Sequence, residues 1–171
     1  MHEILILHTL LNGQNTMYGL TKQILKTFGF LTKPSFGTIQ PALKRLEKKN
    51  YVKSDKFYTE GGKPYFYYSI MPEGKDFLIK KILKSPVKNP VQLYPEIKIK
   101  LVCSNILEDN DKKVLYQDLK LELTKLKTES ETIQKSNSFS SNSYGRIVLD
   151  NTICEYKNLI DLIEGFEKCL Q

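Results

Sequence analysis

The sequence has little cysteine and no long apolar run. Its three cysteines, Cys103, Cys154 and Cys169, include no close pair, which argues against a disulfide framework or a zinc site and fits a reducing compartment. No stretch approaches the roughly 20 apolar residues that a membrane-spanning helix needs. Residues 1–7 lack a basic segment and a small-residue cleavage site. We therefore expect a first helix there rather than a signal peptide, and a cytoplasmic protein.

Histidine is equally scarce, and no catalytic constellation is present. The two histidines, His2 and His8, lie in an apolar segment without ligand partners nearby. The pair Gly61-Gly62 lies between two strand-like runs, where a tight turn explains it, and no glycine-rich loop of the phosphate-binding kind occurs. We interpret the cysteines as small buried hydrophobes. The sequence thus predicts a protein that is not an enzyme and that binds no metal or cofactor.

Positive charge is present in excess, and it is unevenly distributed. The 171 residues carry a formal net charge of +7. Residues 1–84 hold 14 basic and 6 acidic residues, a net charge of +8, whereas the remainder has a net charge of −1. This asymmetry predicts that the first part meets a polyanion and the second meets protein. An AT-rich genome could explain why lysine outnumbers arginine, but it does not explain the asymmetry.

The first part has the element order of three helices, a hairpin and a fourth helix. Residues 3–11 are almost continuously apolar, which indicates a buried helix. Thr16 and Ser35 are suitable N-cap residues for a second and a third helix, and Pro41 should make the start of the third irregular. The predicted ranges are helices over 3–11, 16–28, 35–49 and 72–83, and strands over 51–58 and 65–70. The turn between the strands gives a hairpin with an exposed basic tip.

The second part is predicted to be helical. Residues 85–95 contain three prolines and are predicted to form a linker. Helices are expected over 95–107 and over 146–170. Between them we expect a further helix that carries a short heptad repeat. The apolar positions that we assign to the dimer interface are Tyr116, Leu119, Leu123, Leu126, Ile153, Tyr156, Ile160 and Ile163. Helices of this length are marginal alone in water, so burial against a neighbour must stabilise them.

This arrangement is typical of a winged helix-turn-helix. The fold class we predict is mainly α with a small β-hairpin wing, followed by a helical, coiled-coil-like dimerisation domain. The predicted domains are 1–84 for DNA binding, 85–95 for the linker and 96–171 for dimerisation. A helix of this kind fits the major groove of DNA, which is about 12 Å wide, and a hairpin reaches the adjoining groove or backbone.

Three groups of residues resemble the PadR family of transcriptional regulators. They are Met17-Tyr18-Gly19-Leu20, the run from Gly37 to Glu47 with its unusual Pro41, and Glu60-Gly61-Gly62-Lys63-Pro64 followed by Tyr67-Tyr68. Pro72-Glu73-Gly74 also looks like the family's turn into the fourth helix. The resemblance covers residues 3–83 and implies a dimeric regulator, typically a repressor that is often released by a small effector such as a phenolic acid or a drug.

The resemblance also implies residue roles. Tyr18 and Lys22 resemble phosphate contacts, and Lys63 would be the contact of the wing. The residues that would face the groove are Ser35, Thr38, Gln40 and Lys44. Gln40 stands where the family usually has tyrosine, and a glutamine can pair bidentately with adenine, which suits an A·T-rich operator. The alternatives are that Ser35 only caps its helix, that Tyr18 packs in the core and that Lys44 is merely solvated.

One departure from the family pattern concerns the wing. Tyr65-Phe66 replaces the basic pair that usually follows the wing proline, so the wing has less positive charge than is usual. Because these two residues alternate faces on a strand, we expect one of them in the core.

The sequence thus predicts a cytoplasmic, homodimeric regulator that binds double-stranded operator DNA, with a small-molecule effector as a further partner and no membrane contact. The alternative is a winged-helix module for protein interaction or for plasmid replication or partition. A salt titration of binding to random DNA separates the two, because phosphate binding weakens steeply with salt.

Overall fold

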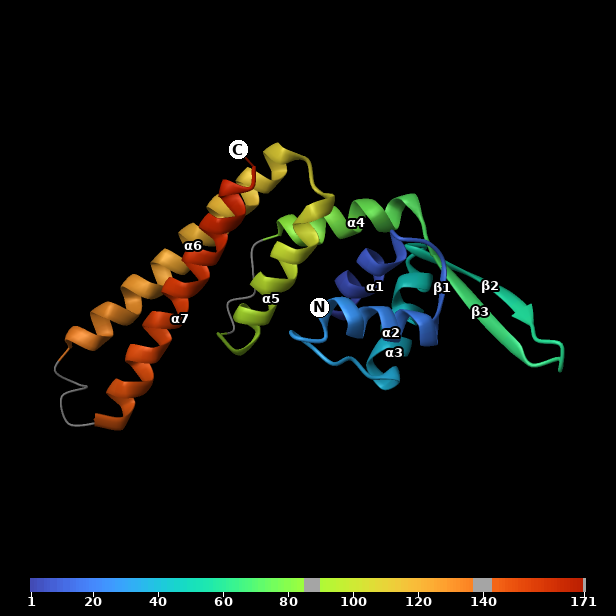
Figure 1. The fold of residues 1–171 in the computed structure, drawn as a ribbon, viewed down its shortest axis with the longest axis horizontal. Helices are drawn as coiled ribbons and strands as arrows, with labels where there is room; N and C mark the ends of the chain where they lie inside the picture. Colours follow the sequence, from blue (N-terminus) through green and yellow to red (C-terminus); the bar gives the residue numbers. More distant parts are fainter. Residues whose placement is uncertain (85–89, 137–142, 171) are drawn as a thin grey trace. The chain divides into compact units, whose positions relative to one another are not determined.

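The computed structural model describes residues 1–84, 90–136 and 143–170 (Figure 1). The chain forms two compact units. The first comprises Met1–Lys84 and Lys98–Ile106, and the second comprises the described residues of Ser85–Ile97 and Leu107–Gln171. The segment 98–106, which the sequence analysis assigned to the C-terminal domain, therefore packs with the first unit.

The first unit is a winged helix-turn-helix, as the sequence predicts. Its elements are α1 (His2–Leu10), β1 (Asn15–Thr16), α2 (Met17–Phe28), α3 (Phe36–Lys48), β2 (Val52–Tyr58), β3 (Pro64–Ile70) and α4 (Pro72–Leu83). The strands form one antiparallel sheet in the order β1-β3-β2. The sheet is small, and its hairpin extends beyond the helices of this unit (Figure 1).

Helix α1 is the centre of this unit. Seven consecutive residues, Ile4 to Leu10, are buried, and α2, α3 and α4 all contact the helix. A helix that is apolar on every side must be covered on every side. Each leucine or isoleucine buried in this way contributes roughly 1.5–3 kcal/mol to stability. The first apolar run in the sequence therefore fixes the positions of the three helices that surround it.

Local capping fixes where α2 and α3 begin. The backbone N–H of Gly19 donates a hydrogen bond of 3.1 Å to the hydroxyl of Thr16, the N-cap residue of α2. The backbone N–H of Ser35, the N-cap of α3, donates to the hydroxyl of Thr38 over 3.0 Å. Both predicted caps are confirmed. Helix α3 continues through Pro41 without a break, although the sequence suggested an irregular start.

The hairpin has nearly the predicted bounds and gains support from a third strand. Strands β2 and β3 pair in register from Val52 opposite Ile70 to Tyr58 opposite Pro64. The turn uses the left-handed conformation of Gly62, whose φ is +74°, a conformation that glycine adopts without steric cost. Strand β1, which the sequence did not predict, adds Asn15 and Thr16 to the free edge of β3.

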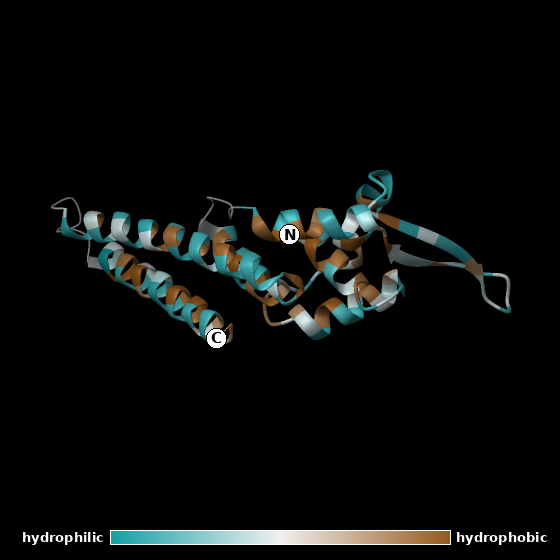
Figure 2. Cartoon of the chain, turned by 90° about the horizontal axis from the view of Figure 1, so that it is seen from above, coloured by the Kyte–Doolittle hydropathy of each residue, from teal (hydrophilic) through white to brown (hydrophobic). Residues whose placement is uncertain are grey.

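The second unit consists largely of two long helices. Helices α6 (Asp109–Lys135) and α7 (Ser143–Lys168) lie side by side (Figure 1). Lys120 near the start of α6 forms an ion pair of 2.6 Å with Glu167 near the end of α7. Gln134 near the end of α6 donates to Asp150 near the start of α7. The two helices are therefore antiparallel, and apolar and hydrophilic residues alternate along both (Figure 2).

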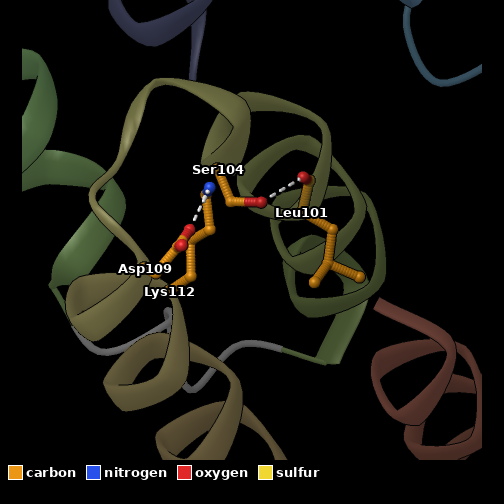
Figure 3. Close-up of polar contacts among 4 residues, drawn as sticks. All are labelled: Leu101, Ser104, Asp109 and Lys112. Carbon is orange, nitrogen blue, oxygen red and sulfur yellow. Dashed lines mark hydrogen bonds and ion pairs between the residues drawn. The ribbon is translucent and has the colours of Figure 1, made fainter. Parts of the chain in front are cut away.

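Helix α5 (Pro90–Cys103) begins earlier than the sequence predicted. Of the predicted linker, residues 85–89 lie outside the described residues, and 90–95 are helical. Pro90 stands at the first position of this helix, where its missing N–H costs nothing, whereas Pro95 lies inside the helix. A short turn (Ser104–Ile106) follows α5, and the hydroxyl of Ser104 donates to the carbonyl of Leu101 over 2.7 Å (Figure 3). At the start of α6, Lys112 donates to Asp109 over 2.8 Å (Figure 3).

The close approach of α4 to the start of β2 generates a prediction. A Cβ atom at Gly74 would lie 2.1 Å from the backbone carbonyl oxygen of Tyr51, which already accepts a hydrogen bond from the N–H of Met71. We expect Gly74→Ala to lower the free energy of unfolding by about 1–3 kcal/mol, because the backbone must shift. Urea denaturation followed by circular dichroism measures this change.

Gly37→Ala is the matched control, since Gly37 also lies in the first turn of a helix. Its Cβ would meet only the Ser35 hydroxyl oxygen, at an ordinary contact distance of 3.6 Å. We expect this variant to be neutral or up to about 1 kcal/mol more stable. Equal losses in the two variants would show that the contact with Tyr51 is not the cause.

Candidate nucleic-acid interface

Helix α3 divides into a buried and an exposed face. The apolar residues Ile39, Ala42, Leu43 and Leu46 are buried in the first unit. All four residues predicted to face a DNA groove, Ser35, Thr38, Gln40 and Lys44, are exposed. The separation follows from the helical repeat of 3.6 residues, which places positions three and four apart on the same side. The helix therefore presents a polar, basic surface to solvent along its length.

The start of α2 extends this exposed surface. The Tyr18 side chain is 68 % exposed and stacks on the ring of Phe36, with 6.4 Å between ring centroids. Lys22 lies one turn further along α2 and is also exposed. The stacking links the first turn of α2 to the first turn of α3. Tyr18 is consequently a surface residue, and the alternative that it packs in the core is wrong.

The hairpin contributes one exposed lysine at its tip. Lys63 is exposed beside the turn, while Lys53 is paired with Asp55 at 2.7 Å and Lys56 lies over the ring of Tyr58 at 4.9 Å. Phe66 is 42 % exposed and Tyr65 is half-buried. The expectation that one of these two residues belongs to the core is wrong, because the Phe66 side chain is exposed and the Tyr65 side chain is only half-buried.

A groove of about 470 Å³ lies between α2, α3 and the hairpin. It brings together three of the predicted DNA-binding residues, Tyr18, Gln40 and Lys44, whereas Lys22, Ser35, Thr38 and Lys63 lie outside its lining. The remaining lining residues are Thr16, Met17, Leu43, Glu47, Ser54, Tyr65, Phe66 and Tyr68. Sequence reasoning missed Glu47, although its spacing from Gln40 and Lys44 places it on the same side of α3.

The two charged residues that line the groove, Lys44 and Glu47, differ in how far they are buried. Lys44 is exposed, and Glu47 is half-buried. Burial raises the pKa of the Tyr68 phenol, and the negative charge of Glu47 raises it further. Tyr68 is therefore a neutral hydrogen-bonding group at physiological pH. Elsewhere on α3, Arg45 forms an ion pair of 3.2 Å with Glu3 of α1, so part of its charge is compensated.

The residues predicted for the dimer interface lie on the facing sides of α6 and α7. Five of them, Tyr116, Leu119, Leu123, Tyr156 and Ile163, are buried within the single chain. The other three, Leu126, Ile153 and Ile160, are half-buried. Rings also meet between the two helices, since Tyr116 lies edge-to-face with Phe166 at 6.0 Å. These apolar positions thus have partners within the chain, and their role between two chains stays a prediction.

The side chains of His8 and Cys103 are buried in the first unit. The ring of His8 is hydrogen-bonded to the side-chain oxygen of Asn105 at 3.0 Å and lies edge-to-face with Phe28. Cys103 is buried, and burial raises the pKa of its thiol to about 12. Cys154 and Cys169 are exposed, so the expectation that the cysteines are buried is wrong for these two. No cluster of three or more metal-ligating side chains occurs among the described residues. None of the described helices is long and apolar enough to cross a membrane.

Comparison with known proteins identifies the family. Residues 6–80 match the family model of the transcriptional regulator PadR-like family. A PadR family transcription regulator from Clostridium difficile is 35 % identical over 47 % of this chain and 81 % of its own, with a TM-score of 0.38. The chain belongs to the PadR family. All seven predicted DNA-binding residues lie within the part that matches the PadR family.

Two further solved structures are similar to this PadR family member. A transcriptional regulator from Clostridium thermocellum is 34 % identical over 46 % of this chain and 76 % of its own, with a TM-score of 0.42. Bacillus subtilis PadR in complex with operator DNA is 20 % identical over 96 % of this chain and 94 % of its own, with a TM-score of 0.47. No curated protein matches the chain.

Proposed function

We propose that this PadR family regulator binds double-stranded DNA through its first unit, with α3 in the major groove. The observation that carries the proposal is the continuous exposed surface formed by the polar face of α3 and the start of α2, beside the hairpin. The first 84 residues carry a net charge of +8, which favours a polyanionic partner. In this family member, Gln40 reads a base, and Lys22, Lys44 and Lys63 contact phosphates.

We further propose that the protein acts as a homodimer held by its second unit. The residues first predicted for this role largely cover one another within the chain, so a second chain has to contact the sides of α6 and α7 that remain exposed. Large apolar side chains are exposed there, namely Leu121, Tyr144, Ile147, Val148 and Leu162. Tyr144, Ile147 and Val148 lie three and four residues apart on one face of α7, and adjoining exposed apolar side chains of this kind are typical of protein interfaces. A two-fold dimer would read a near-palindromic operator.

Repression and release by an effector complete the proposal. Bacillus subtilis PadR, which is 20 % identical to this chain, has been solved with operator DNA and with p-coumaric acid. By analogy, we propose that the dimer occupies a promoter in the cytoplasm and leaves it when a small molecule binds. The second candidate is a module for protein interaction or for plasmid replication or partition. A steep salt dependence of binding to random DNA would argue against a module that binds only protein.

Substitutions of Gln40 and Lys63 separate base reading from phosphate binding. Gln40→Ala should cost about 1–3 kcal/mol on the operator and relax base choice at one position of each half-site. Lys63→Ala should weaken binding to operator and random DNA alike and make the dependence on salt shallower. Fluorescence anisotropy with DNA from upstream of the protein's own gene, and with random DNA of equal length, measures both effects.

Exposed residues of the same type supply the controls. Gln92 lies on α5 and Lys75 on α4, and both side chains are exposed. Gln92→Ala and Lys75→Ala should leave both affinities unchanged. If Gln40→Ala lowered the affinity for operator and random DNA equally, the assignment of Gln40 to base reading would be wrong.

Two aspartate substitutions test the dimer. Val148 is 66 % exposed and Leu123 is 0 % exposed. Val148→Asp should convert the dimer to monomer in sedimentation experiments with the helix content retained, and it should weaken operator binding because two linked half-sites bind more tightly than one. Leu123→Asp should instead lower the helix content, because a charge would be buried between α6 and α7. A fully dimeric Val148→Asp variant would place the interface elsewhere.

A further inference from the structure

The groove beside α3 has aromatic walls. Four of its lining residues carry aromatic rings, Tyr18 from α2 and Tyr65, Phe66 and Tyr68 from β3. Met17 and Leu43 add apolar surface. A volume of about 470 Å³ lies within the range of roughly 300–1,000 Å³ that is typical of small-molecule sites, which are mostly apolar with a few polar groups. The groove therefore has the dimensions and lining of a ligand site.

Among the described residues, the Glu47 carboxylate in this groove has no hydrogen-bonding or ion-pair partner. It is half-buried, and no ion pair or hydrogen bond of its side chain occurs among the residues that the structure describes. Lys44 lies one turn earlier on α3 but does not pair with it. A partly buried carboxylate without a partner has lost some of its hydration without compensation. A cation in the groove would restore that lost interaction.

We propose that this groove binds a small organic cation that carries an aromatic ring or a quaternary ammonium group. Aromatic faces attract such cations through their quadrupoles, and an adjacent carboxylate supplies the opposite charge. Tyr65, Phe66 and Tyr68 form the aromatic wall, and Glu47 is the counter-charge. The phenol of Tyr68 stays neutral beside Glu47, because burial and the Glu47 charge raise its pKa, and its ring adds to the attraction.

The positions of the two charged residues favour a cation over an anion. The amine of Lys44 belongs to an exposed side chain, which keeps its hydration and can turn towards solvent, whereas Glu47 is half-buried. Lys44 is the only lysine in the lining of this groove, and salt screens charges beyond about 10 Å at 0.1 M ionic strength. Direct contact with Glu47 therefore outweighs the net positive charge of the unit.

The position of the groove couples the cation to DNA. Tyr18, Gln40 and Lys44 line the groove and also form the DNA surface under the proposed function, on which this consequence rests. A cation bound there covers Gln40 and places positive charge beside Lys44. Cation and operator should therefore exclude each other, which would make the groove an effector site located within the reading surface itself.

Three benzyl compounds of different charge test the chemistry of the groove without DNA. Benzyltrimethylammonium, benzyl alcohol and phenylacetate are titrated into the full chain and followed by calorimetry and ligand-observed nuclear magnetic resonance. We expect the cation to bind about tenfold more tightly than the alcohol, and phenylacetate to bind least. Equal binding of the three compounds, or no binding of the cation, would overturn the proposal.

Two pairs of variants locate the binding. Glu47→Gln should weaken the cation about tenfold and leave the alcohol unchanged, while Glu73→Gln, at an exposed carboxylate of α4, should change neither. Phe66→Ala should weaken both compounds about fivefold. Phe30→Ala is its control and should change neither affinity, because the Phe30 ring is exposed and Phe30 does not line the groove. Cation binding unaffected by Glu47→Gln would contradict the assigned counter-charge.

Competition on DNA keeps this inference distinct from the proposed function. Benzyltrimethylammonium chloride should displace the wild-type chain from operator DNA, sodium chloride at equal concentration controls for ionic strength, and the Glu47→Gln variant should resist displacement. Cation binding by a chain that binds no DNA would overturn the proposed function and leave the groove assignment standing. DNA binding without any cation binding would overturn the groove assignment alone.

Discussion

The burial of α1 is the constraint on which the first unit depends. Its residues from Ile4 to Leu10 are covered by α2, α3 and α4, so each of these helices must turn its apolar side inwards. The polar side of α3 is then forced outwards, and with it Gln40 and Lys44. The surface that we propose for DNA binding is in this sense a by-product of core formation. No separate interaction is needed to expose the polar side chains, because the helical repeat places them opposite Leu43 and Leu46.

The hairpin lies beside the exposed side of α3. Strand β3 lies between β1 and β2, and pairing with Thr16 ties it to the residue that caps α2. The same short segment therefore starts α2 and holds the hairpin. This connection places Phe66 and Tyr68 beside α3, where they form a groove with Glu47. Without the hairpin, α3 would be a single exposed helix. With the hairpin, a groove lies beside it.

The elements of the first unit follow from local signals, and the groove does not. The apolar run of α1, the caps Thr16 and Ser35, and the glycine turn of the hairpin each depend on neighbouring residues, so the sequence predicts them. Strand β1 has only two residues and exists because Tyr67 and Tyr68 offer it an edge. The role of Glu47 likewise depends on the approach of β3. An apolar stripe such as that of α6 predicts burial, but it does not say whether the partner is α7 or a second chain.

The central claim is that two copies of the first unit read DNA in a fixed, symmetric arrangement. Hydroxyl-radical footprinting on the DNA upstream of the protein's own gene tests it most directly. The account predicts two protected half-sites, related by a dyad and separated by about one or two helical turns, because each protomer offers one recognition helix. Protection without a dyad, or no protection at low salt, would contradict it.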